Sequence, residues 1–270
     1  MSSPWSDLDR APLSASRLRH ALDGGPVWRE IQVRTTTEST NAEVAAAART
    51  GAAEGLVVIA EHQSAGRGRL DRTWSATPRS AVLLSALLRP TVGVSSWPLL
   101  PLLTGLAVVE AFDAVAGVTA ALKWPNDVLI GGRKVAGILV ERVEEAVVVG
   151  IGINVSTRAD ELPVETATSL ALAGGSIDRE IVTREVLRGL ARRYRGWLDR
   201  DGAPGSVIPA YRERCETIGL QIELRLPEGD VVRGTATEID DSGRLVLRDE
   251  ATGVERAWLV GDVTHVRKVS

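Results

Sequence analysis

Cysteine and histidine are scarce in this chain of 270 residues. The single cysteine, Cys215, excludes an internal disulfide, as is typical of proteins made for a reducing compartment. The three histidines, His20, His62 and His265, are too scattered to give the spacing of a metal-ligand set. We therefore expect neither a disulfide scaffold nor a structural zinc site.

An excess of positive charge is missing as well, because the formal net charge is -3. This balance argues against a general nucleic-acid binder, although it leaves room for a local basic loop. The first residues, 1–7, lack the basic start and apolar core of a signal peptide, and we find no apolar run that approaches the length of a membrane span. With 44% hydrophobic residues the chain has enough apolar side chains for one large core and a second small unit. We expect a soluble, cytoplasmic enzyme.

The most informative stretch is residues 66–74, which read G-R-G-R-L-D-R-T-W. It follows an apolar run, 56–60, that is typical of a buried strand. Arginine binds phosphate through paired N–H donors, and glycine lets the main chain approach a ligand closely. The stretch therefore predicts a phosphate-binding loop, while a solvated surface turn or an unstructured nucleic-acid tail is the alternative. The residues that carry this interpretation are Gly66, Arg67, Gly68, Arg69, Arg72 and Trp74.

Charged and amide side chains also interrupt two apolar runs further along the chain. The block K-W-P-N-D at 123–127 leads into an apolar run, turns at Gly131-Gly132 and returns as K-V-A-G-I-L-V-E at 134–141. Because a Gly-Gly pair between apolar runs predicts a hairpin, Lys123, Asn126, Asp127 and Lys134 should lie near two adjacent strands. The alternative is an ordinary turn with lysines on the surface.

A third apolar run, 147–155, contains two glycines and Asn154 in its interior. Glycine inside a strand commonly marks the close approach of a ligand or of another backbone segment. We therefore expect this strand to lie beside a binding site.

These motifs, in this order, resemble those of the biotin protein ligases, the enzymes that attach biotin to carrier proteins. The resemblance runs from about Thr37 to the C-terminus and rests on several spaced blocks. An earlier block, Ser39-Thr40-Asn41, is similar to the family's biotin-contacting S-T-N element. The residues 40–43 also predict a capping box that opens a helix ending near Arg49, and a helix N-terminus offers free N–H groups to a polar ligand.

The resemblance implies an ATP-dependent ligase. Such an enzyme makes biotinyl-AMP from biotin and ATP, with Mg²⁺ accompanying the triphosphate, and transfers biotin to a lysine of a carrier domain. The implied partners are biotin carboxyl carrier domains of acetyl-CoA, acyl-CoA or pyruvate carboxylases. The sequence leaves open whether the chain is a monomer or a homodimer.

The resemblance also assigns roles to residues. The implied catalytic residues are Arg67, Arg69, Lys134 and Asp127. The implied biotin contacts are Ser39, Thr40, Asn41, Gln63, Gly66, Arg67, Gly68, Arg69, Lys134 and Gly137. The implied ATP or adenylate contacts are Arg69, Arg72, Trp74, Lys123, Asn126, Lys134 and Asn154. Asp127 is the carboxylate expected near the metal or near the acceptor amine, and the sequence does not decide between these two roles.

We expect an α+β fold, with a mixed-sheet catalytic domain of the biotin/lipoate ligase type and a small C-terminal SH3-like β-barrel. The expected divisions are an N-terminal extension at 1–33, the catalytic domain at 34–216 and the SH3-like domain at 217–270. Apolar runs predict strands, and amphipathic or apolar stretches predict helices. The expected strands of the first domain are 57–60, 81–88, 121–130, 134–143 and 146–155, and the expected helices include 14–22, 97–115 and 178–198.

Two other functions fit parts of the pattern. A lipoate or octanoate ligase shares the fold and the adenylate chemistry, but the arginine-rich loop and K-W-P-N-D look more like the biotin branch. A biotin-responsive DNA regulator needs a DNA-reading domain, and the roughly 35 residues before Ser39 are too few for a winged helix-turn-helix. We therefore expect no DNA binding.

Overall fold

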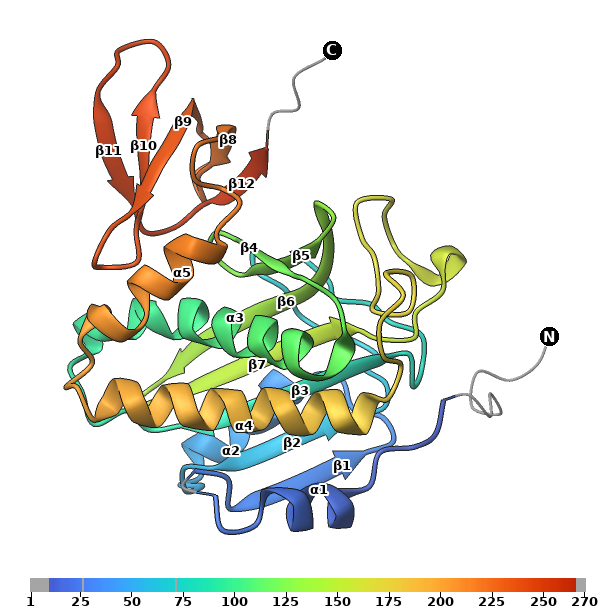
Figure 1. Ribbon diagram of the computed structural model, residues 1–270. Coiled ribbons are helices and arrows are strands. Elements are labelled where there is room, and N and C mark those ends of the chain that lie inside the picture. The colour runs from blue at the N-terminus through green and yellow to red at the C-terminus, as the bar shows by residue number, and fades with distance from the viewer. Residues whose placement is uncertain (1–9, 26, 71, 266–270) are drawn as a thin grey trace.

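The computed structural model describes residues 10–25, 27–70 and 72–265 (Figure 1). Its main sheet is mixed, because β1 and β2 are parallel while the other neighbours are antiparallel. Six of its strands match expected apolar runs closely or in part, which confirms the α+β class. In spatial order the strands are β1 (Glu30–Arg34), β2 (Leu56–Ala60), β3 (Ala81–Leu88), β7 (Ala146–Asn154), β6 (Arg133–Val143), β5 (Asp127–Ile130) and β4 (Ala121–Lys123).

Two long helices, α3 (Leu100–Ala111) and α4 (Arg179–Leu198), pack on one face of this sheet, as Figure 1 shows. The short helix α1 (Ala15–Leu22) contacts β1 and α4, and α5 (Ile208–Arg214) contacts α3 and β4. The helix α2 (Thr40–Arg49) contacts β2, β3 and β7 from the other face and forms a separate apolar cluster there.

The side chains of β3 point alternately to the two faces of the sheet and pack into apolar clusters on both. Val82, Leu84 and Leu88 join the large core that contains α3 and α4. Leu83 packs near Trp74 instead, and Leu87 belongs to the cluster under α2. Because strand side chains point alternately to opposite faces, this strand is apolar along its whole length. Only part of its second face is covered by α2, and the remainder is available to a ligand.

Helix boundaries follow the expected capping residues at most ends. Ser14 caps α1 and Asp178 caps α4, each accepting from main-chain N–H groups of the first turn. Gly117, in the left-handed conformation with φ 68°, ends the turn after α3. One boundary was predicted wrongly: Ser39, rather than Thr40, is the N-cap of α2, because the Ser39 hydroxyl accepts from Ala42 N.

The expectation of no apolar run of membrane-spanning length was also wrong. Within the described residues, the helical span Val94–Ala116 has 23 residues and contains an 18-residue window with a mean hydropathy of 1.8, so by length and composition it could cross a membrane. Its apolar window is 72% buried against other elements of the fold. We therefore assign this span, which contains α3, to the protein core.

Three strands of the sheet differ from the sequence prediction. The expected strand 121–130 is two strands, β4 and β5, which pair antiparallel on either side of a turn at 124–126 that contains a cis Trp124-Pro125 bond. Strand β1 was not predicted, because its sequence E-I-Q-V-R has only two apolar residues. It pairs with β2 along all five residues and begins at Glu30. The expected domain boundaries at 34 and 217 stay predictions.

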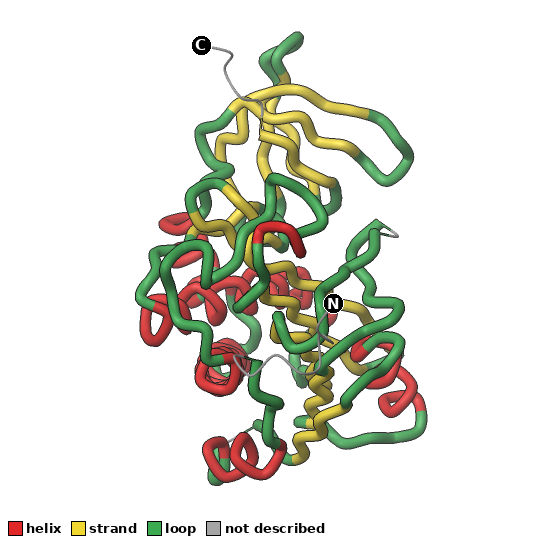
Figure 2. Tube along the Cα trace, turned by 90° about the vertical axis from the view of Figure 1, so that its right-hand side faces the viewer, coloured by secondary structure: helices red, strands yellow, loops and turns green. Residues whose placement is uncertain are grey.

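The C-terminal unit is a five-stranded antiparallel sheet, seen above the main sheet in Figures 1 and 2. It is consistent with the expected SH3-like domain. Buried Trp124 anchors it to the main body, since its Nε1 donates to Gly243 O over 2.9 Å. The strands in spatial order are β11 (Glu255–Trp258), β10 (Leu245–Asp249), β9 (Val231–Ile239), β8 (Gln221–Arg225) and β12 (Asp262–His265).

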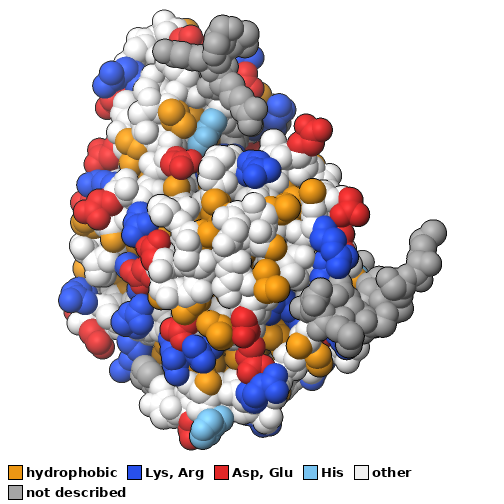
Figure 3. Space-filling view, turned by 45° about the vertical axis from the view of Figure 1, so that its right-hand side comes forward, with side chains coloured by type: hydrophobic (Ala, Val, Ile, Leu, Met, Phe, Trp, Pro, Cys, Tyr) orange, Lys and Arg blue, Asp and Glu red, His pale blue; other side chains and the backbone are white. Residues whose placement is uncertain are grey.

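Charges of both signs are mixed on the surface. On the face seen in Figure 3, Lys and Arg side chains alternate with Asp and Glu side chains, in keeping with the formal net charge of -3. On this face the charges form no broad basic field for a polyanion.

Candidate active site

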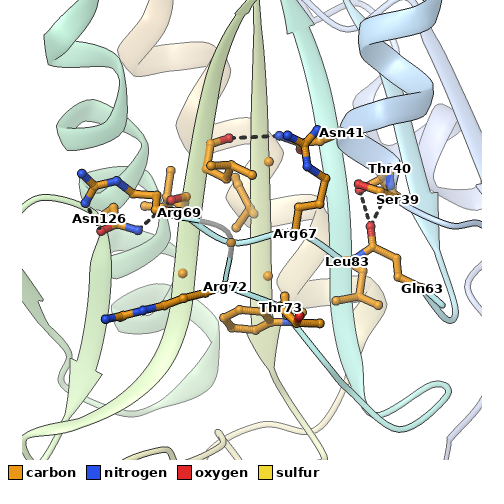
Figure 4. A pocket seen from close by; sticks show the side chains of 18 of the residues that line it. Ser39, Thr40, Asn41, Gln63, Arg67, Arg69, Arg72, Thr73, Leu83 and Asn126 are labelled. Carbon is orange, nitrogen blue, oxygen red and sulfur yellow. Dashed lines mark hydrogen bonds between the residues drawn. The ribbon is translucent and has the colours of Figure 1, made fainter. Parts of the chain in front are cut away.

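A pocket with a cavity volume of about 130 Å³ lies on the face of the sheet that α2 only partly covers (Figure 4). Its walls are the N-terminus of α2, the loop 66–74, and parts of β3, β5, β6 and β7. Thirteen of the expected site residues line it: Ser39, Thr40, Asn41, Gln63, Arg67, Gly68, Arg69, Arg72, Trp74, Asn126, Asp127, Lys134 and Gly137. The pocket therefore collects motifs that are far apart in the sequence.

The N-terminus of α2 and Gln63 form one end of the pocket. Thr40 donates to the Gln63 side-chain carbonyl twice, from its main-chain N over 2.7 Å and from its hydroxyl over 2.9 Å. Figure 4 shows these two residues facing each other across the pocket edge. Because the carbonyl of Gln63 is held by Thr40, the orientation of its amide is fixed. This end presents hydroxyl and amide groups, which suit a neutral polar ligand.

Asn41 is held in the wall by protein groups on both sides. Its Oδ1 accepts from the Ser85 hydroxyl over 2.5 Å, and its Nδ2 donates to Glu141 Oε2 over 2.7 Å. Gly150 of β7 lies directly beneath it, since a Cβ at that position would be 2.1 Å from Asn41 Oδ1. The glycine that the sequence marked for close approach thus makes room for Asn41.

The loop 66–74 folds back on itself as a small hairpin. Arg67 and Thr73 form an antiparallel bridge, Gly68 N donates to Arg72 O over 2.7 Å, and Trp74 N donates to Gly66 O over 2.9 Å. A Cβ on Gly66 would be 2.3 Å from Trp74 O. The glycine at this position is therefore needed for the closing bond of the hairpin.

The three arginines of the loop contact three different walls. Arg67 pairs with Glu141 at 3.0 Å, Arg69 donates to Asn126 Oδ1 over 3.1 Å, and Arg72 pairs with Asp262. Burial lowers the pKa of Arg69, and the charges of Asp262 and Asp127 oppose this effect. The guanidinium groups are thus spread along the pocket and do not converge on a single point.

Trp74 lies over a slot between two strands that only glycine permits. Gly137 of β6 and Gly152 of β7 are cross-strand partners. A Cβ on Gly137 would be 2.9 Å from the Trp74 ring, and a Cβ on Gly152 would be 2.6 Å from it. The indole N–H of Trp74 is buried without a hydrogen-bond partner among the described residues. The two glycines thus make room for the flat indole ring, and its single N–H donor is left for a ligand.

Lys134 brings a second cation beside this slot. Its Nζ is 2.6 Å from Asp127 Oδ1 and 5.7 Å from the centre of the Trp74 ring. The main chain of Lys134 is fixed on both sides, because its N donates to Thr166 O and its O accepts from Thr168 N, each over 2.8 Å. These bonds determine where the ammonium group enters the pocket.

Three expected contacts do not line the pocket: Lys123, Asn154 and Gly66. Burial lowers the pKa of Lys123, although Asp127 and Asp262 counteract this effect. Lys123 thus lies within electrostatic range of the pocket. Asn154 is buried in β7 and donates to Thr168 O over 2.9 Å, so it supports the segment that holds Lys134. Gly66 shapes the loop.

The structure also adds lining residues that sequence reasoning missed. Gly150 and Gly152 were recognised only as strand glycines, and Leu83 carried no signal because it reads as core. Asp262 comes from the C-terminal sheet, and nothing in its local sequence separates it from other surface carboxylates. Its role appears only when the two units are placed together.

A set of metal ligands is absent from the part of the chain that the structure describes, where no group of three or more His, Cys, Asp or Glu side chains converges. Mg²⁺ commonly uses one or two carboxylates together with phosphate oxygens of its substrate. Asp127 supplies such a carboxylate in the pocket. The residues present therefore fit Mg²⁺ brought in with a nucleotide.

Comparison with known proteins shows which family the chain belongs to. Residues 33–157 match the biotin/lipoate A/B protein ligase family, and residues 217–266 match the biotin protein ligase C-terminal domain. The biotin–[acetyl-CoA-carboxylase] ligase of Mycobacterium tuberculosis is 41% identical over 97% of this chain and 98% of its own length. The bifunctional ligase/repressor BirA of Bacillus subtilis is 35% identical over 87% of this chain and 74% of its own length.

Among solved structures, the biotin protein ligase from Aquifex aeolicus in complex with biotin and ATP is similar, with a TM-score of 0.76. It is 27% identical, and the match covers 89% of this chain and 100% of that chain. Fold, site and relatives together define the class: the chain belongs to the biotin/lipoate A/B protein ligase family. Within that family it belongs to the biotin protein ligases, which confirms the resemblance inferred from the sequence motifs.

Proposed function

We propose that this ligase activates biotin as biotinyl-5′-AMP, with release of pyrophosphate, and then transfers biotin to a lysine of a carrier domain. The observation that carries the proposal is one pocket that combines a polar end at α2, the aromatic ring of Trp74 and several cationic side chains. These parts suit the ureido ring of biotin, the adenine ring, and the carboxylate and phosphate that must react.

The first step brings two anions together. A carboxylate oxygen of biotin attacks the α-phosphorus of ATP, a mixed anhydride forms, and pyrophosphate leaves. Arg69 and Lys134 line the pocket, where their positive charges reduce the repulsion between carboxylate and phosphate. Because their main chains or side chains are fixed by protein contacts, little reorganisation is needed when charge develops.

Each remaining site residue has a task that its contacts support. Thr40 and Gln63, already bonded to each other, hold the polar head of biotin, with Ser39 and Asn41 beside them. Trp74 covers the adenine ring. Arg67, paired with Glu141, closes the biotin end. Gly68 and Gly137 let the ligand approach the main chain, while Asn126 and Arg72 contact the nucleotide.

The metal and the second step both involve Asp127. Mg²⁺ bound with ATP supplies charge neutralisation at the triphosphate, and Asp127 is the residue that would hold it. In the second step the ε-amine of the carrier lysine attacks the acyl carbon of the anhydride, and AMP leaves. The amine must first lose a proton, and Asp127, 2.6 Å from Lys134 Nζ, or water accepts it.

Biotin-dependent exchange of labelled pyrophosphate into ATP tests the first step. We expect exchange with biotin, Mg²⁺ and ATP, and none when biotin is omitted. Lipoate and octanoate serve as matched controls, because ligases for these acids share the fold and the chemistry. Exchange that is supported by lipoate or octanoate as well as by biotin would contradict the assignment to biotin.

The partners and the location of the enzyme are further proposals. We propose that the acceptors are biotin carboxyl carrier domains of acetyl-CoA, acyl-CoA or pyruvate carboxylases, and that the enzyme works in the cytoplasm. Some relatives are named ligase/repressors. We propose that this chain acts as a ligase without DNA binding, in keeping with its formal net charge of -3. A gel-shift assay with promoter DNA and biotin would contradict this by showing a specific complex.

A further inference from the structure

Asp262 differs from the other residues that line the pocket because it comes from the C-terminal sheet. It is the first residue of β12, where it is the cross-strand partner of Arg225 in β8. The pocket is therefore completed by a side chain more than a hundred residues away from the motifs that form the rest of it. This placement gives the C-terminal sheet direct contact with the loop 66–74.

Two neighbouring residues of the C-terminal sheet hold two arginines of the loop. Both carboxylate oxygens of Asp262 accept from Arg72, from Nη1 over 3.2 Å and also from Nη2. The carbonyl of Gly261 accepts from Arg69 Nη1 over 3.3 Å. A paired contact between guanidinium and carboxylate fixes orientation as well as distance. The loop is thus attached to the C-terminal sheet at two points.

The segment that carries these acceptors is itself held firmly. Gly261 has φ +153°, and a Cβ there would be 2.4 Å from Leu224 Cδ1. Leu224 is fully buried in the core, so it has no space to move aside. The whole sheet is in turn fixed to the main body by the bond from Trp124 to Gly243. Asp262 is therefore a stationary anchor for a side chain on the loop.

We infer that Asp262 is a positioning residue, which holds Arg72 and thereby keeps the loop 66–74 over the bound adenylate. This inference rests on the proposed function. Asp262 acts through Arg72 and contacts no reacting atom, so its removal should affect how long the intermediate is retained more than how fast it is made. The C-terminal sheet then contributes to the lifetime of the intermediate.

The direct test is the release of synthetic biotinyl-5′-AMP from the loaded full-length protein. For Asp262→Asn we expect release about fivefold faster than from wild type, the size of a partly exposed ion pair. The adenylation rate at saturating biotin and ATP should change less than twofold. Glu223→Gln is the matched control, because the Glu223–Arg233 pair joins β8 and β9 with similar side-chain exposure, 32% and 67% against 26% and 61%. Release from this control should equal that of wild type.

A double-mutant cycle separates positioning from a structural effect. In an Arg72→Gln background, Asp262→Asn should cause no further acceleration, because the partner is already absent. Unchanged or slower release from Asp262→Asn alone would overturn the inference, as would equal acceleration in both backgrounds. Since the adenylate is supplied ready-made, these outcomes do not depend on its synthesis. A failure of pyrophosphate exchange by wild type would instead refute the proposed function.

Discussion

At the scale of single residues, Arg69 occupies the most demanding position in the site. It is largely buried, its pKa is lowered by that burial, and it bridges Asn126 and the C-terminal sheet. A buried guanidinium next to a phosphate makes charge-assisted hydrogen bonds, each of about 1.5–3 kcal/mol. We predict that Arg69→Ala releases biotinyl-5′-AMP roughly 10- to 100-fold faster than wild type.

The control for this prediction is Arg248→Ala, which removes an exposed arginine paired with Glu255 on the C-terminal sheet. In stopped-flow or filter-binding measurements, this control should release the adenylate at the wild-type rate. Thermal unfolding should show that Arg69→Ala keeps the fold. The loss of adenylate retention is then a local effect of the missing guanidinium. Equal retention by Arg69→Ala and wild type would contradict a role in holding the adenylate.

A second feature at the scale of single residues is the close contact between the Trp74 ring and Gly152. Because a Cβ on Gly152 would be 2.6 Å from the indole, Gly152→Ala must displace the ring from its seat. Stacking on an aromatic side chain is worth about 1–3 kcal/mol per base, so we predict that KM for ATP rises roughly tenfold or more. KM for biotin should change little. Gly205→Ala is the control, since nothing lies within 4 Å of its Cβ. A larger rise in KM for biotin than in KM for ATP would show that the adenine ring binds elsewhere.

At the scale of elements, the hairpin 66–74 depends on one glycine more than on the other. A Cβ on Gly66 would be 2.3 Å from Trp74 O, whereas a Cβ on Gly68 has its nearest neighbour, Arg72 O, at 3.2 Å. We predict that Gly66→Ala opens the hairpin and raises KM for both substrates, while Gly68→Ala has the smaller effect. Steady-state kinetics of the two variants provide the comparison. An equal loss in both would show that backbone freedom, and not this contact, explains the glycines.

Much of this element scale could be predicted from the sequence. The periodicity of α4 and the all-apolar run of β3 depend on local composition and gave nearly correct boundaries. Strand β1 could not be predicted in this way, because two apolar residues in an edge strand give little signal. Its pairing with β2 depends on tertiary structure. Asp262 could not be predicted for the same reason, because it reaches the pocket only through the packing of the C-terminal sheet.

At the scale of the whole molecule, His265 in β12 is a half-buried titratable group where the C-terminal sheet meets the main body. Its Nε2 is 3.3 Å from the Thr217 hydroxyl, and burial lowers its pKa below the ordinary 6.5, helped by the nearby charge of Lys123. The unfolded chain therefore binds a proton more readily than the native protein at this residue. His265 therefore destabilises the native protein relative to the unfolded chain only at low pH. This loss of stability is absent well above pH 6.5 and develops as the pH falls through 6.5 toward the native pKa of His265.

We predict that His265→Gln loses less stability than wild type when the pH is lowered from about 8 to about 5. The measurement is the free energy of unfolding against pH for both proteins, with His20→Gln on exposed α1 as the control. The control should follow wild type. A steeper loss in His265→Gln than in wild type would show that the protonated imidazole stabilises the native protein.

The most direct measurement of the whole account is a crystal structure with biotinyl-5′-AMP. We predict adenine stacked on the Trp74 ring, the phosphate near Arg69 and Lys134, and the biotin head at Thr40 and Gln63. A second, largely apolar cavity beside the first, with Trp97 and Trp124 in its walls, is the competing location. Density for the adenylate in that cavity, or with the loop 66–74 turned away from it, would contradict the account.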